Sequence, residues 1–282
     1  MNHVHQPKLN DKGQIMFSSP RAIVDATKGD FMNGDASWIG ESKADYVRKT
    51  RTGDSSRVAE AEKLLSKIEP EFNRECVVWQ NSVSGAYADV AAFLANDPEC
   101  MRRRLVTEDD RSPLRVWVDV ASSCQISWQD LLPRGIAALA LVMQLIRNGR
   151  AVELWTFASL HGRTAGQTVP CVQMCTTPID MASVAYCLTS QGFSRGICYA
   201  TARQFNGFNG AWGAHYVRYG TLAARLAGAR KTLEGLAAPQ DIILPAPYVE
   251  DKHDKGDAGL IFRDPVKWVL ETCKRAEEGG VQ

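Results

Sequence analysis

The segments LRVWVDV at 114–120 and AVELWTF at 151–157 decide the fold, together with the apolar segment at 130–148 that joins them. Both outer segments are short and rich in β-branched and aromatic residues, which is typical of strands. In the segment between them, apolar residues recur at helical spacing, with Pro133 near the start and Gly149 just past the end, where helices favour these residues. A strand, a helix and a second strand predict an α/β fold.

The same alternation continues toward the C-terminus. The sequence there predicts strands at 169–175 and 241–246, helices at 181–188 (ended by Gly192), 217–233 and 265–278, and a loop at 249–259. We therefore expect residues 113–282 to form a mostly parallel sheet flanked by helices.

Before Pro113 the pattern is weaker. The sequence predicts a helix at 55–68, a strand at 76–79 and a short helix at 87–94. Residues 1–112 are expected to form a smaller α+β region, either a small domain of its own or an elaboration packed on the sheet.

Composition limits the class of protein. The 282 residues include 33 Lys and Arg against 32 Asp and Glu, a net charge of +1, which excludes a uniformly basic nucleic-acid coat. No apolar run reaches the roughly 18 residues that a membrane span needs. The first dozen residues are polar and contain no signal-peptide core, so a cytoplasmic location is expected. The eight cysteines form no CxxC pair, which favours reduced, buried thiols and predicts neither a metal site nor another cofactor.

The end of the first strand, Asp119-Val-Ala-Ser-Ser123, resembles the Asp-x-Ser-x-Ser metal site of von Willebrand A domains. The order strand, helix, strand, strand, helix resembles that fold as well. Ala121 occupies the first serine position and removes one oxygen ligand, so the expected scaffold is von Willebrand A-like with a degenerate metal site. The alternative is that Asp119 and Ser122 cap or line the sheet edge. The sequence also contains no phosphate-binding loop and no nucleophile elbow, so we expect no enzymatic activity.

The charges are unevenly distributed. Residues 154–233 contain one acid, Asp180, where an even spread would place about nine (80 × 32/282). The same residues contain seven bases, a net charge of 7 − 1 = +6, which leaves −5 for the remainder of the chain. A nearly neutral protein therefore contains one basic segment.

Aromatic and glycine residues alternate with the bases in this segment. Arginines can contact phosphates while flat rings stack on unpaired bases, so the pattern predicts a single-stranded DNA-binding surface. A second basic cluster precedes the first strand and could extend the same groove. The alternative is that the rings fill the core and the second cluster is a solvated surface. The residues predicted to contact DNA are Arg195, Arg203, Phe205, Phe208, Trp212, Tyr216, Arg218, Arg102, Arg103 and Arg104.

Several short motifs between about residues 30 and 155 resemble a phage-encoded family. They are Asp35-Ala-Ser-Trp38-Ile-Gly40, Ser82-Val-Ser-Gly85, Asp97-Pro-Glu-Cys-Met101, Arg134-Gly135 and Gly149-Arg-Ala-Val-Glu153. They are similar to the single-stranded DNA-binding RNA polymerase cofactors (Drc) of lytic podoviruses. The resemblance implies a role in phage transcription, with replication left open, and implies phage RNA polymerase as a partner in the host cytoplasm. Coating of DNA would favour self-association.

Two functional hypotheses follow. The first is a sequence-tolerant single-stranded DNA-binding protein that assists phage RNA polymerase. The second is a von Willebrand A-like module that binds a protein partner such as an AAA+ ATPase through the strand end at Asp119, with the aromatic segment as core and no DNA binding.

Overall fold

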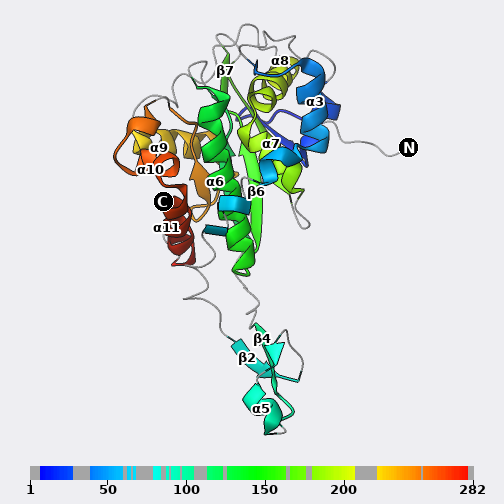
Figure 1. Cartoon of the computed structure of the whole chain (residues 1–282). Coiled ribbons are helices and arrows are strands. Elements are labelled where there is room, and N and C mark those ends of the chain that lie inside the picture. The colour runs from blue at the N-terminus through cyan, green and yellow to red at the C-terminus, as the bar shows by residue number, and fades with distance from the viewer. Residues whose placement is uncertain are drawn as a thin grey trace, which may run out of the picture.

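A computed structural model gives the fold (Figure 1). It describes residues 7–27, 39–59, 62–64, 66–67, 79–83, 87–88, 90–95, 97–104, 113–122, 126–162, 166–175, 180–206, 221–248 and 250–278.

The main sheet has the strand order β1-β8-β6-β5-β9, with β7 paired to β8. β5 is parallel to β6 and to β9, and β1 is parallel to β8. β6 and β8 are antiparallel. The predicted α/β class with a mostly parallel, helix-flanked sheet is confirmed. The strands of this sheet are β1 (Gln14–Phe17), β5 (Leu114–Asp119), β6 (Val152–Phe157), β7 (Leu160–Gly162), β8 (Gly166–Cys175) and β9 (Ile242–Leu244).

Helices pack on both faces of this sheet, and Figure 1 shows α6 and α7 in front of it. The described α-helices are α1 (Pro20–Ala26), α3 (Lys43–Thr52), α5 (Val90–Leu94), α6 (Trp128–Arg147), α7 (Met181–Thr189), α8 (Tyr199–Asn206), α9 (Leu222–Thr232), α10 (Asp257–Arg263) and α11 (Pro265–Glu277). Short 3-10 turns cover Ser55–Arg57 and Asp251–His253, and a π-helix covers Gly192–Cys198.

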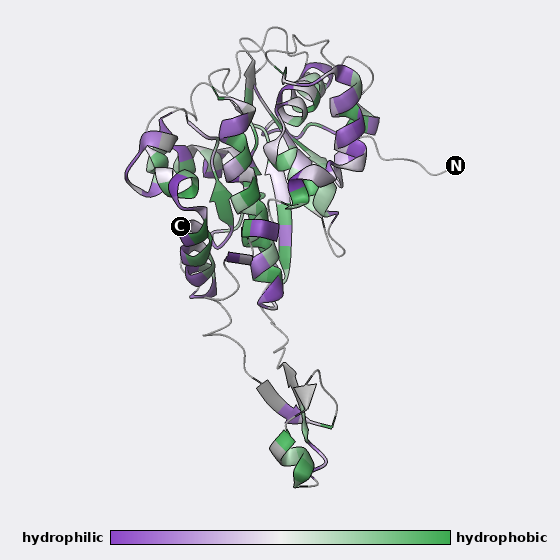
Figure 2. Ribbon diagram, in the orientation of Figure 1, coloured by the Kyte–Doolittle hydropathy of each residue, from purple (hydrophilic) through white to green (hydrophobic). Residues whose placement is uncertain are grey.

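The sheet divides the core because strand residues alternate between its faces. Val116 and Val118 of β5 belong to the large cluster that includes α6, α7 and α11, whereas Trp117 belongs to a smaller cluster with α9. The Trp117 ring stacks on Trp155 at 5.3 Å between centroids, and its indole N–H donates to Asp241 Oδ2 at 3.1 Å. Figure 2 shows the strands and the middle of α6 as mainly hydrophobic.

Local sequence sets the limits of α6. Ser127 and Asp130 form a capping box, in which each side chain bonds the other residue's backbone N–H. Gly149, with φ +81°, follows the last turn. Within the described residues, α6 is also the one helix long and apolar enough to cross a bilayer, and 67% of that stretch is buried in the fold, as in the core helix of a globular protein.

The described parts of residues 1–112 lie in two places. β1 lies in the main sheet beside β8, and α3 packs on α7 and on the π-helix. A second sheet of order β2-β4-β3, built from β2 (Trp79–Ser82), β3 (Tyr87–Ala88) and β4 (Met101–Arg104), lies apart from the main body in Figure 1. β1 and α3 thus pack with the main sheet, and the second sheet is built from residues between 79 and 104.

Three local predictions were wrong. Gly192 does not end the helix at 181–188: α7 ends at Thr189 with Ser190 as its extended C-cap, and Gly192 begins the π-helix. Gly192 and Gly196 of the π-helix pack against Tyr46. A Cβ at Gly192 would lie 2.5 Å from Tyr46 Cβ, so only glycine permits this contact. The expected loop at 249–259 contains a 3-10 turn and the start of α10. The expected short helix at 87–94 is β3 followed by α5.

Cysteines that the structure describes are free and mostly buried, as predicted. Burial raises the pKa of the Cys171, Cys187 and Cys198 thiols, and raises that of Cys273 to about 12. Thiols that stay protonated are poor nucleophiles and poor metal ligands.

Candidate functional site

The strand order identifies one position on the sheet where a site is expected. From β5 the chain passes through α6 to β6 on one side, and after β8 it crosses to β9 on the other side of β5. The order therefore reverses between β5 and β9. In open α/β sheets, ligands bind outside the carboxyl ends of the strands at such a switch point.

A pocket of about 1170 Å³ lies beside β9, one of the two strands at this switch point. Leu244 and Pro245, at the carboxyl end of β9, line it together with Arg134 of α6. The remaining walls come from α9, α10 and α11, and their apolar lining residues include Leu222, Leu226, Leu260, Phe262 and Trp268. Charged side chains line the pocket as well, including the buried Arg134, Arg225 and Asp251. A concave site that combines apolar walls with convergent polar groups is typical of a binding site. We call these residues the switch-point pocket.

Arg134, which lines the switch-point pocket, joins α6 to the end of β9. Its side chain is 4% exposed and donates to the carbonyl oxygens of Leu244 at 3.2 Å and Pro245 at 2.8 Å. Burial lowers the pKa of Arg134 to about 10, against the opposing effect of the Asp119 and Asp251 carboxylates. The guanidinium is therefore still charged at neutral pH, and it joins the first turns of α6 to the end of β9.

Besides Arg134, a buried ion pair between Arg225 and Asp251 holds the turn after β9. Arg225 of α9 donates to both carboxylate oxygens of Asp251, at 2.9 and 2.6 Å, and to the Ala246 carbonyl at 2.9 Å. Asp251 also accepts the backbone N–H of Tyr248 at 2.8 Å. The side chains of Arg225 and Asp251 are only 2% and 8% exposed. The turn after β9 is thus held by two arginines from two different helices.

Asp119, at the end of β5, is 0% exposed, and its Oδ1 accepts the backbone N–H of Ala121 at 2.9 Å. Ser122 is also buried. Asp119 therefore caps the strand end, in line with the alternative to a metal site. Among the described residues, no group of three His, Cys, Asp or Glu lies close enough to hold a metal ion.

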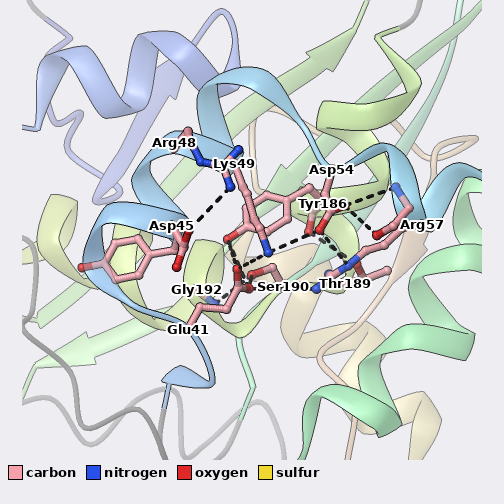
Figure 3. A network of polar contacts seen from close by, with 12 residues as sticks. Glu41, Asp45, Arg48, Lys49, Asp54, Arg57, Tyr186, Thr189, Ser190 and Gly192 are labelled. Carbon is pink, nitrogen blue, oxygen red and sulfur yellow. Dashed lines mark hydrogen bonds and ion pairs between the residues drawn. The ribbon is translucent and has the colours of Figure 1, made fainter.

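A second polar cluster joins α3 to α7 on the other side of α6 (Figure 3). Glu41 accepts from the Ser190 hydroxyl at 2.8 Å and pairs with Lys49 at 3.0 Å. Lys49 also pairs with Asp54 at 3.4 Å, and the Arg57 guanidinium lies 5.3 Å from the Tyr186 ring centroid. Burial, and next the Glu41 charge, raises the pKa of Tyr186. The named acids and bases balance, so the cluster is a structural connection between helices.

Arg195 has to be removed from the predicted DNA contacts. It lies in the π-helix, is 2% exposed, and donates to the Ile126 carbonyl at 2.9 Å, as does Gln191 at 2.6 Å. These bonds hold the segment before α6. A buried guanidinium that holds this segment cannot reach a phosphate.

The other predicted contacts fall into three groups. The Phe205 ring is partly buried and packs edge-to-face on Phe17, with centroids 6.3 Å apart, so it is largely a core residue. Arg203 is half-buried on α8. The remaining nominations Phe208, Trp212, Tyr216 and Arg218 lie outside the described residues, and of Arg102, Arg103 and Arg104 the structure describes the β4 backbone.

The residues of the switch-point pocket were not found from the sequence. Arg225 is one of the seven bases of residues 154–233, and Asp251 lies 26 positions later in the expected loop at 249–259, so nothing in the sequence pairs them. Arg134 carried a weak signal, because a lone arginine in the first turns of an apolar helix needs a buried partner. The predicted site and the observed pocket therefore share no residue.

One family model matches most of the chain. A family model described as "Domain of unknown function (DUF7192)" matches residues 8–275. No curated protein and no solved structure matches the chain. Because the match spans nearly the whole sequence, the chain belongs to the DUF7192 family.

Proposed function

We propose that the chain is an interaction module that binds a protein partner at the switch-point pocket. The observation that carries this proposal is the position of that pocket beside β9, where the order of the described strands reverses, with the buried Arg134 and Arg225 in its lining. The partner is a protein such as an AAA+ ATPase.

A von Willebrand A-like scaffold fits this proposal. The element order β5, α6, β6, β8, α7 resembles that fold, and the short β7 precedes β8. On this reading Asp119, which caps the strand end, would stand where that fold has its metal site, with Ala121 in place of a serine. The module proposed here binds its partner without a metal ion at this strand end.

Site-specific photocrosslinking tests the proposal with two exposed alanines. Ala223 lines the switch-point pocket, whereas Ala151 lies at the opposite, amino end of β6. Benzoylphenylalanine at each position is irradiated in cells that make the protein, and adducts are identified by mass spectrometry. A protein adduct at position 223 that is absent at position 151 is expected. No adduct at 223, or equal adducts at both positions, would exclude the pocket as the docking site.

A second candidate function is sequence-tolerant binding of single-stranded DNA, as a cofactor of phage RNA polymerase in transcription or replication. One observation favours it: the three consecutive arginines of β4 lie in the middle of the small sheet and outside the main core. A gel shift with labelled single-stranded and duplex DNA at low salt is the test. Binding to the single strand is expected, and a preference for duplex or no shift would remove this candidate.

A further inference from the structure

The pairing of the small sheet places aromatic residues opposite arginines. β2 and β4 are antiparallel, with Trp79 opposite Arg104 and Asn81 opposite Arg102. β3 and β4 are also antiparallel, with Tyr87 opposite Arg102. Directly opposed positions of antiparallel strands share one face of a sheet, as do alternate positions of one strand. Positions 79, 81, 87, 102 and 104 therefore share one face, and positions 80, 82, 88, 101 and 103 share the other.

Exposure is described for three positions of these strands. Asn81 is exposed, whereas its neighbour Ser82 and the opposed Met101 are both half-buried. Position 81 shares its face with positions 79, 87, 102 and 104. These four positions are two aromatic residues and two arginines.

The residue types on this face match the needs of an unpaired nucleic-acid strand. Rings stack on bases of any identity, arginines pair with phosphates, and an asparagine amide can bond base edges. β2, β3 and β4 contain three arginines and no acid. The backbones of the two outer strands are about 10 Å apart, since neighbouring strands are spaced by roughly 4.8 Å.

We propose that this face of the small sheet is a stacking platform for single-stranded nucleic acid, with Trp79 and Tyr87 as base-stacking residues and Arg102 and Arg104 as phosphate contacts. The proposal rests on the second candidate function and moves its centre from the segment after α8 to the β2-β4-β3 sheet. Arg103, on the opposite face, is not part of the platform.

Fluorescence anisotropy of the full-length protein with labelled oligo(dT) of 20 nucleotides tests the rings. The double variant Trp79→Ala/Tyr87→Ala is expected to bind about 30-fold more weakly, a factor of about five for each ring. The matched control is Phe93→Ala, which removes a ring that is 63% exposed on α5 of the same small unit. The control is expected to bind as the wild type does.

The arginines are tested by the salt dependence of the same binding. Arg102→Gln/Arg104→Gln is expected to reduce the slope of log K against log salt by about 1.4, because each single-strand phosphate contact contributes about 0.7. Arg103→Gln, on the same strand and the other face, is the control and is expected to leave the slope unchanged. Circular dichroism checks that each variant is folded.

Ultraviolet crosslinking of oligo(dT) to the wild-type protein gives a readout that needs no variant. Adducts at Trp79 or Tyr87 are expected, and adducts confined to other residues would overturn the platform. If the wild type binds oligo(dT) but the ring and arginine variants bind equally well, the platform is wrong while DNA binding stands. If the wild type binds no single strand, the second candidate function fails and the platform fails with it.

Discussion

Removing one member of the Arg225–Asp251 pair should cost much of the protein's stability. Asp251→Ala leaves the Arg225 guanidinium, which is 2% exposed, without its two carboxylate bonds of 2.9 and 2.6 Å. It also removes the acceptor of the Tyr248 N–H. Breaking a buried pair in this way costs about 3–5 kcal/mol. For a chain of this size that corresponds to a loss of about 10 °C in Tm.

The assay is urea unfolding followed by far-ultraviolet circular dichroism. The surface pair Lys267–Glu271 is the control, because its atoms are 3.7 Å apart and its side chains are 60% and 49% exposed. Lys267→Ala is expected to cost less than about 1 kcal/mol. The double variant Arg225→Met/Asp251→Leu is expected to recover most of the loss, since it leaves no unpaired buried charge.

The result that would refute this reasoning is a loss below about 1 kcal/mol for Asp251→Ala, equal to the surface control. Such a result would mean that the pair is open to water and does not hold the turn after β9. A double variant as unstable as Asp251→Ala would show that the turn, and not the charge, is what Asp251 stabilises.

Three further predictions concern other parts of the molecule. Gly192→Ala should destabilise the protein by about 2 kcal/mol or more in urea unfolding, because its Cβ would lie 2.5 Å from Tyr46 Cβ; unchanged stability would contradict the close contact. Arg195→Met should lower Tm and leave oligo(dT) affinity unchanged, because Arg195 is bonded to the Ile126 carbonyl; weaker binding by a fully folded variant would restore its predicted role. Although desolvation opposes both shifts, Glu41 and Asp54 raise the pKa of Lys49, and Ser56 and Lys49 lower that of Asp54. The stabilising contribution of Lys49 to folding is therefore complete below about pH 10 and is lost as the pH rises through its folded pKa. The stabilising contribution of Asp54 is complete above about pH 4 and is lost as the pH falls through its folded pKa. Unfolding at pH 9 to 11 should show a shallower alkaline loss for Lys49→Met than for the wild type, and an equal loss would exclude the network.

Much of the fold could be predicted because its signals are local. The β5, α6 and β6 segments were found nearly to the residue, since strand composition and the caps of α6 depend on neighbours in sequence. β1 was missed because its four residues, QIMF, become a strand only by pairing with β8, more than 150 positions later. α3 was missed because it is mostly polar and buries only Tyr46 and Thr50.

The candidate site was harder to predict because the presence of charged and aromatic residues in a sequence does not show which of them are buried. The acid-poor segment 154–233 was interpreted as a binding surface, but Arg195 and Arg225 in it are buried. Phe193 and Tyr199 belong to the core as well, which is the alternative that the sequence had left open for the rings. Long-range pairs such as Arg225 with Asp251 exist only once the strand order is known.

Hydrogen–deuterium exchange with the protein partner captured at position 223 tests the central claim most directly. If the partner docks in the switch-point pocket, exchange should slow in α9 and α10 and stay unchanged in β2 and β4 of the small sheet. Protection confined to regions away from α9, α10 and α11 would contradict a docking site at the switch point.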